Sequence, residues 1–213
     1  EEWTIRQVIK KHSDFVAYSV CMDVERTEPV LGEDGKPDGD KTEKVVKEET
    51  LNSMKAIWTR DKKEITDEEY NEFYQHISHD WTPPLAHLHV KLEGATEYSA
   101  LLYIPAMPPF DLFFRESKHG VQLYSKRVFI MENCKELMPP YLTFIKGVVD
   151  APDLNLNVSR EILQQDVLVR NIRKNLVKKI LELLAGMEKE KYDQFFKAFG
   201  PIFKTGVSTD YEN

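Results

Sequence analysis

The sequence has few cysteines, few glycines and no long apolar run, and each shortage excludes a class of protein. Its only two cysteines, Cys21 and Cys134, lie far apart without the spacing of a zinc site, so free thiols are expected. None of its nine glycines forms a phosphate-binding pattern such as G-x-x-x-x-G-K or G-x-G-x-x-G, so the sequence shows no nucleotide loop of its own. No run is long and apolar enough to span a membrane.

Apolar and charged residues are both abundant in the 213-residue chain, at 41% hydrophobic and 31% charged. That balance allows one sizeable core, or one core with an appended helical piece. The net charge of -7 argues against a general nucleic-acid-binding protein. The chain opens with EEW and lacks an initiator methionine, so we expect a fragment of a longer protein.

The first third of the chain predicts a strand, a loop and a helix. Residues 17–24 alternate between apolar and polar side chains, which is typical of a half-buried strand. Residues 26–50 are charged and rich in Gly, Pro and Asp, and they predict an exposed loop that could have irregular strands on either side. Thr66 and Glu69 form a capping box at the start of a helix. Its buried stripe would comprise Tyr70, Phe73, Tyr74 and Ile77.

The remaining two thirds predict strands followed by helices. Three strand patterns lie at 87–94, 98–105 and 121–131, and the second is continuously apolar, as in a central strand. A helical pattern spans 135–150, and a longer one begins at Ser159. This order indicates a layered α/β domain with a helical extension.

Four histidines raise the question of a metal site. His76 and His79 lie three apart on the predicted helix, while His87 and His89 share one face of a strand. A zinc site could be drawn from them, but no cysteine is nearby and solvent-facing strands often carry histidine. We therefore predict no metal site.

An aromatic segment follows the second strand pattern, in IPAMPPFDLFF. Prolines prevent continued strand pairing there, and apolar side chains come directly after them. These side chains could be core, or they could form an exposed binding surface, and Trp81 beside two prolines raises the same question. The apolar side chains are Phe110, Leu112, Phe113 and Phe114.

The stretch NLNVSREILQQ places a cation at a helix start. Ser159 could cap the helix, with Arg160 in the first turn. The macrodipole makes that end electropositive, so an arginine there is mildly unfavourable. The helix alone gives no reason for Arg160.

Several long motifs resemble the middle domain of the ninety-kilodalton heat-shock chaperone family. They are IWTRDKKEITDEEYNEFYQHISHDW, LLYIPAMPPFDLF, LYSKRVFIM, YLTFIKGVVDAPDLNLNVSREILQQ and IRKNLVKKILELL, in this order. The resemblance covers nearly the whole chain except 26–50, and that short segment favours a bacterial or organellar member. It implies an α/β/α sandwich, the large middle subdomain, over 1–165, and connecting helices over 166–213.

The resemblance implies a role for the NVSRE motif. In the family, ATP and Mg bind in a separate N-terminal domain, and the motif's arginine, here Arg160, reaches the γ-phosphate. A guanidinium fork suits phosphate oxygens and offsets charge that develops in the transition state. Gln164 would be a second contact, while Asn157 and Ser159 would shape the loop. The fragment would be inactive alone and would contribute to ATP hydrolysis in the full-length chaperone.

The resemblance also implies partners. Trp81 matches a tryptophan linked to client binding, and Phe110, Leu112 and Phe113 match an amphipathic client loop. Partners would be unfolded or partly folded clients, the N-terminal ATPase domain, co-chaperones and a second copy in a full-length homodimer, in the cytoplasm or an organelle. Nucleic acid and membrane are not expected. The alternatives are a pure protein-interaction module with a structural Arg160, and the transducer domain of a related DNA-acting ATPase.

Overall fold

The computed structural model divides into two compact units, 1–55 and 56–213. The first contains a helix and a long hairpin, and the second contains a sheet with helices. No described helix is both long and apolar enough to cross a bilayer. The structure describes residues 2–31, 37–94, 96–110, 112, 120–154, 163 and 166–210.

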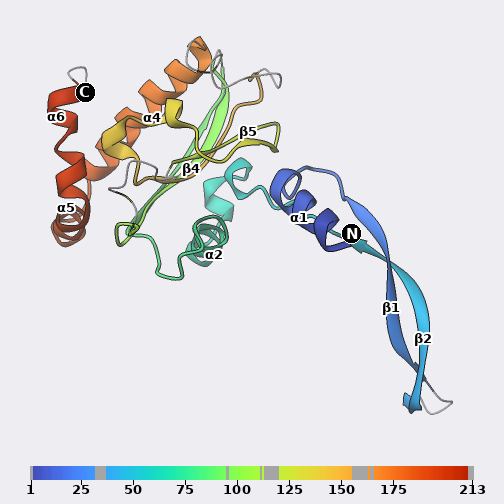
Figure 1. Cartoon of the computed structure of the whole chain (residues 1–213). Coiled ribbons are helices and arrows are strands. Elements are labelled where there is room, and N and C mark those ends of the chain that lie inside the picture. Colours follow the sequence, from blue (N-terminus) through green and yellow to red (C-terminus); the bar gives the residue numbers. More distant parts are fainter. Residues whose placement is uncertain are drawn as a thin grey trace. The chain divides into compact units, whose positions relative to one another are not determined.

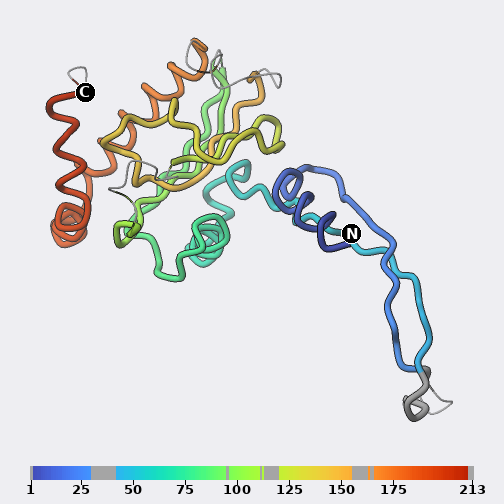
Figure 2. The backbone as a smooth tube through the Cα atoms, viewed as in Figure 1, coloured from blue at the N-terminus to red at the C-terminus, as the bar shows by residue number. Residues whose placement is uncertain are grey.

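The first unit consists of α1 (Glu2–His12) and two long antiparallel strands, β1 (Cys21–Leu31) and β2 (Pro37–Thr50). Figure 2 traces the strands as a twisted ribbon. The expectation of an exposed loop over 26–50 is therefore wrong for the paired residues. Composition alone is misleading here, because charged residues can form a strand when they reach opposite charges at nearby positions of the neighbouring strand.

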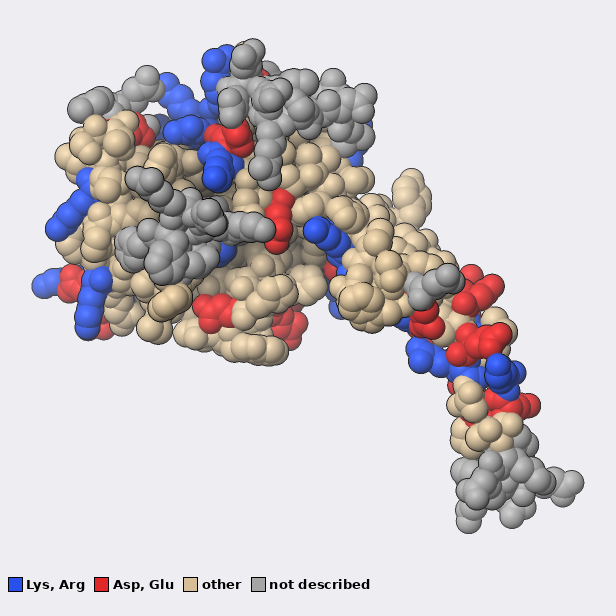
Figure 3. All heavy atoms as spheres, in the orientation of Figure 1, with Lys and Arg blue, Asp and Glu red and all other residues tan. Residues whose placement is uncertain are grey.

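Ion pairs across the ribbon show this pairing of charges. Lys44 Nζ lies 3.3 Å from a carboxylate oxygen of Glu25, and Lys47 pairs with Glu28. Figure 3 shows the basic and acidic side chains intermixed along the ribbon. Most of the described side chains are exposed, as the sequence predicted, although Val24 is buried and the backbone is paired from Cys21 to Pro29.

The second unit is built on a five-stranded sheet in the order β3-β4-β7-β5-β6. All neighbours are antiparallel except β5 and β7, which are parallel. The predicted helix over 135–150 is wrong at its end, because a buried strand, β7, occupies 146–150. The strands are β3 (Ala86–Leu92), β4 (Tyr98–Ile104), β5 (Gln122–Ser125), β6 (Val128–Met131) and β7 (Lys146–Asp150).

Helices cover both faces of this sheet, so the fold is an α/β/α sandwich (Figure 1). Helix α2 (Asp67–Ser78) lies on one face, where the Tyr103 hydroxyl donates to the Tyr70 carbonyl oxygen at 2.9 Å. Helix α4 (Val167–Ala185) lies on the other face and shares a core with Leu102 and Ile104 of β4. The central strand is buried on both sides, as its continuous apolar sequence predicted.

A helical extension follows, formed by α5 (Lys189–Phe203) and α6 (Gly206–Thr209). Phe199 of α5 stacks on Phe144 with ring centroids 4.4 Å apart, so the extension shares the core of the sandwich. Short 3-10 helices connect other elements: η1 (Ile57–Thr59), η2 (Lys62–Glu64), η3 (Lys135–Leu137) and η4 (Pro140–Leu142).

The capping box at the start of α2 is confirmed. Glu69 N donates to Thr66 Oγ1 at 3.3 Å, and Thr66 N donates to Glu69 Oε2 at 3.0 Å. Behind it, Tyr70, Phe73 and Tyr74 are buried, as the helical spacing predicted. The helix is thus fixed at its N-terminus and along one face.

Candidate functional site

Two buried leucines mark the predicted phosphate-contacting segment, residues 155–165. Leu154 precedes it and is 3% exposed, and Leu163 falls within it and is fully buried. Both leucines belong to the core that α4 shares with the sheet. The candidate residues themselves lie outside the described residues: Asn157, Ser159, Arg160 and Gln164.

A buried carboxylate stands just before this segment, at the end of β7. Asp150 is 4% exposed, and its Oδ2 accepts hydrogen bonds from Trp58 Nε1 at 3.0 Å and from Arg127 N at 3.1 Å. Burial raises the pKa of Asp150, and the hydrogen bond from Trp58 opposes that shift. A carboxylate so buried is retained only with hydrogen-bond donors around it.

Three hydrogen bonds fix the turn between β7 and the segment. Ala151 N donates to the Tyr124 carbonyl oxygen at 3.0 Å, which extends the pairing of β7 with β5. Leu154 N donates to the Ala151 carbonyl oxygen at 3.1 Å, and Ser125 Oγ donates to the Leu154 carbonyl oxygen at 3.3 Å. The chain therefore enters the segment from a fixed position on the sheet.

Helix α4 begins after the segment, and its N-cap is Asp166, which is not among the residues predicted to cap a helix. Asp166 accepts hydrogen bonds from Leu168 N at 2.7 Å and from Val169 N at 3.4 Å. A signal for it is present in the sequence as an Asp directly before an apolar periodic run. The helix start predicted at Ser159 lies outside the described residues.

The second candidate site, the predicted client surface, contains an exposed tryptophan. Trp81 is 83% exposed. Asp80 beside it is held on three sides: its Oδ1 accepts from Thr82 N at 2.9 Å, its Oδ2 accepts from Tyr74 OH at 3.1 Å, and its N–H donates to Ser78 Oγ at 3.1 Å. The indole is therefore presented to solvent from an ordered turn.

The segment after β4 separates its apolar residues. Phe110 is 92% exposed, whereas Leu112 is only 5% exposed and lies in the core. Leu112 N donates to the Pro109 carbonyl oxygen at 3.0 Å, which closes a turn beneath Phe110. The expectation that Leu112 belongs to an exposed surface is wrong, because its side chain anchors the turn. Phe113 and Phe114 lie outside the described residues.

The histidine face of β3 is covered, in contrast to the solvent-facing strand expected. Tyr70 stacks on His87 with ring centroids 4.1 Å apart. His89 Nε2 donates to the Trp58 carbonyl oxygen at 3.0 Å, and its Nδ1 lies 2.8 Å from Tyr70 OH. Burial lowers the pKa of His89, which favours the neutral ring, and in that form Nδ1 accepts from Tyr70. Among the described residues no group of three His, Cys, Asp or Glu side chains could hold a metal ion.

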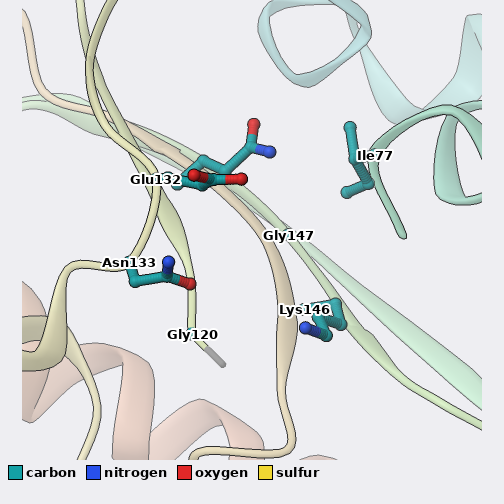
Figure 4. Close-up of a pocket in the computed structure, with 7 residues that line it drawn as sticks. Ile77, Gly120, Glu132, Asn133, Lys146 and Gly147 are labelled. Atoms are coloured by element: carbon teal, nitrogen blue, oxygen red, sulfur yellow. The ribbon is translucent and has the colours of Figure 1, made fainter. Parts of the chain in front are cut away.

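The described residues of this unit line a groove and a smaller pocket. The groove is lined largely by residues that come soon after Trp81 in sequence. Its lining residues are Asp67, Asn71, Pro83, Pro84, Leu85, Ala86, His87 and Lys191. A smaller polar pocket of about 60 Å³ is shown in Figure 4, with Glu132, Asn133 and Lys146 around it and Ile77 of α2 to one side. That volume is well below the several hundred Å³ of an ordinary cofactor site.

Comparison with known proteins defines the family. The family model described as Hsp90 protein matches residues 31–213, and the chain belongs to the Hsp90 family. Similar proteins include the Chaperone protein HtpG of Geobacter sulfurreducens, at 55% identity, and of Nocardia farcinica, at 54% identity, both over 217 residues. The protein of the same name from Mycobacterium tuberculosis is 50% identical over 215 residues. Each alignment covers 100% of this chain and 33% of the relative, so the chain spans about one third of their length.

Proposed function

We propose that this chain is the middle segment of an ATP-dependent chaperone and that Arg160 contributes to ATP hydrolysis in a separate N-terminal domain. The observation that carries the proposal is the motif NLNVSREILQQ, whose Leu163 is buried in the core that also holds the preceding Leu154. Membership of the Hsp90 family supports it. The family match gives no support to the DNA-acting alternative.

The chemistry assigned to this segment is phosphate recognition. The other domain would hold ATP and Mg, which supply the phosphoryl group and part of its charge neutralisation. Arg160 would donate several hydrogen bonds in a fixed fork to the γ-phosphate oxygens and so stabilise the transition state. Gln164 would make a second polar contact, and Asn157 and Ser159 would shape the segment.

The second part of the proposal is a client-binding surface that includes Trp81 and Phe110. Exposed aromatic side chains on ordered turns can bind apolar segments of unfolded polypeptide at little entropic cost. Their exposure, at 83% and 92%, supports this role. Phe113 completes the proposed surface. Co-chaperones, a homodimer of the full-length protein and a cytoplasmic location belong to the same proposal.

The experiment for the ATPase role uses the full-length protein with Arg160→Ala and Arg160→Lys. Loss of one such donor typically lowers turnover about a hundredfold. We expect that loss for Arg160→Ala with an unchanged melting temperature, and only partial recovery for Arg160→Lys, because an ammonium cannot make the forked contact. Unchanged turnover would leave the chain as a protein-interaction module with a structural arginine.

A further inference from the structure

We propose that Asp150, Trp58 and Ser125 form a positioning network that fixes where the Arg160 segment leaves the sheet. This inference rests on the proposed function of Arg160. It concerns residues that are distant from one another in sequence and touch no nucleotide themselves. They would act through the turn at 151–154, which ends directly before the segment.

The network begins at the tight turn between β5 and β6. Lys126 and Arg127 occupy it with φ values of 51° and 65°, which are left-handed conformations that non-glycine residues rarely adopt. Two successive positive φ values are typical of a two-residue hairpin turn, but such turns usually use Asn and Gly. Strain of this kind persists only where the surroundings fix it. Here the Arg127 N–H donates to the buried carboxylate of Asp150.

Trp58 is the second residue that holds the Asp150 carboxylate in place. Its indole is fully buried and packs on Phe73 and Tyr124, with ring centroids at 5.6 and 5.1 Å. Its Nε1–H donates to the same oxygen of Asp150 that accepts from Arg127. A single oxygen thus joins η1, the β5–β6 turn and the end of β7.

Ser125 connects this turn to the chain that precedes Arg160. It lies directly before Lys126, is 1% exposed, and donates to the carbonyl oxygen of Leu154. Arg160 follows Leu154 by six residues. A misplacement of about 1 Å at a reacting group can lower a rate about a hundredfold, so the position at which the chain leaves Leu154 would affect turnover through Arg160. Asp150 would therefore affect turnover as well as stability, because it holds the turn next to Ser125.

The test measures ATP turnover and melting temperature of the full-length protein with single substitutions. Ser125→Ala removes the link to Leu154 and should lower kcat about threefold to tenfold with KM for ATP unchanged, since partial misplacement costs less than the full effect. Asp150→Ala should lower kcat more. Asp150→Asn should retain most of the kcat that Asp150→Ala loses, because the single amide oxygen of Asn can accept both hydrogen bonds. Tyr70→Phe is the matched control: it removes a buried hydrogen bond to His89 in the same layer, and kcat should not change.

Combination with Arg160→Ala distinguishes positioning from general stability. If the network acts through Arg160, Ser125→Ala and Asp150→Ala should lower kcat no further in the Arg160→Ala background. An equal loss in both backgrounds, or a loss that also occurs in Tyr70→Phe, would overturn the inference. If Arg160→Ala itself has no effect, the proposed function fails instead. Should Asp150→Ala not fold, the Ser125→Ala variant in the two backgrounds is sufficient to support or overturn the inference.

Discussion

The β1–β2 hairpin and the five-stranded sheet show two different ways to stabilise strands. The hairpin strands have 11 and 14 residues, yet most of their described side chains are exposed, and ion pairs such as Arg26–Glu49, Lys44–Glu25 and Lys47–Glu28 join the two strands. The sheet strands have four to seven residues, and the central ones are buried on both faces. Coverage by helices, and not strand length, decides how much apolar area each strand removes from water.

This difference matters for function because the candidate site residues depend on the covered sheet. Exposed ion pairs contribute little to stability, since solvent and salt screen them. Leu154, the last described residue before the Arg160 segment, belongs to the core around β4 and β7. We therefore expect large effects from substitutions in the sheet and small effects in the hairpin.

The largest effect should come from Gly147 in β7. Its φ is 138°, and an added Cβ would lie 2.2 Å from the Leu101 carbonyl oxygen on the neighbouring strand. Gly147→Ala should lower the free energy of unfolding by about 4 kcal/mol or more, measured by urea denaturation. Gly94→Ala is the control, because its φ of 132° is similar but nothing lies within 4 Å. It should cost only backbone strain, about 1–3 kcal/mol, and equal losses would contradict the packing argument.

The next effect separates Leu112 from its exposed neighbour. Leu112→Ala should lower the free energy of unfolding by about 2–5 kcal/mol, as for other buried leucines. Phe110→Ala should change it by less than about 0.5 kcal/mol. The double change Trp81→Ala with Phe110→Ala should leave the melting temperature nearly constant while weakening binding of an unfolded model protein several-fold. A marked loss of stability in that double variant would place these aromatics in a core.

A smaller effect should appear as a pH dependence of stability. Burial lowers the pKa of His89, while the hydrogen bond to the Trp58 carbonyl opposes that shift. Below the unfolded-state pKa of about 6.5 the unfolded chain then binds more protons, so stability falls as the pH falls through that window. His89→Gln should flatten this dependence between about pH 7.5 and 5.5 in urea unfolding. An unchanged slope would show that another group dominates.

The smallest effect should come from Glu49 in the hairpin. Arg26, and then Arg6, hold the pKa of Glu49 below its usual value through hydrogen bonds. This contribution is present above the unfolded pKa of Glu and is lost as the pH falls through the folded pKa. Glu49→Gln should slightly increase hydrogen exchange of the β1–β2 amides at low salt, and high salt should remove the difference. A salt-independent increase would mean that Glu49 acts through packing.

Local signals predict part of this fold well. The capping box at Thr66 and Glu69 needs only residues three apart, and the central strand β4 shows as a continuous apolar run. The sequence predicts strand β7 as the end of a helix, because a short apolar run is compatible with either a buried strand or a buried helix. The hairpin resembles a loop in sequence, because its stabilising charges lie on a facing strand.

The network around Asp150 could not be predicted for a similar reason. Trp58 and Asp150 are 92 positions apart, and no sequence pattern links them. The sequence predicts exposed histidines on β3, because alternation reveals two faces of a strand but does not show what covers each face. The prolines after Trp81 leave open in sequence whether its indole is core or surface, and the structure shows it exposed.

Single-turnover hydrolysis of bound ATP by the full-length protein tests the central claim most directly. It separates the chemical step from nucleotide binding and product release. For Arg160→Ala we predict a chemical step about a hundredfold slower, with ATP affinity and melting temperature close to those of the unsubstituted protein. A chemical step of unchanged rate would contradict the proposed role and remove Arg160 from the mechanism.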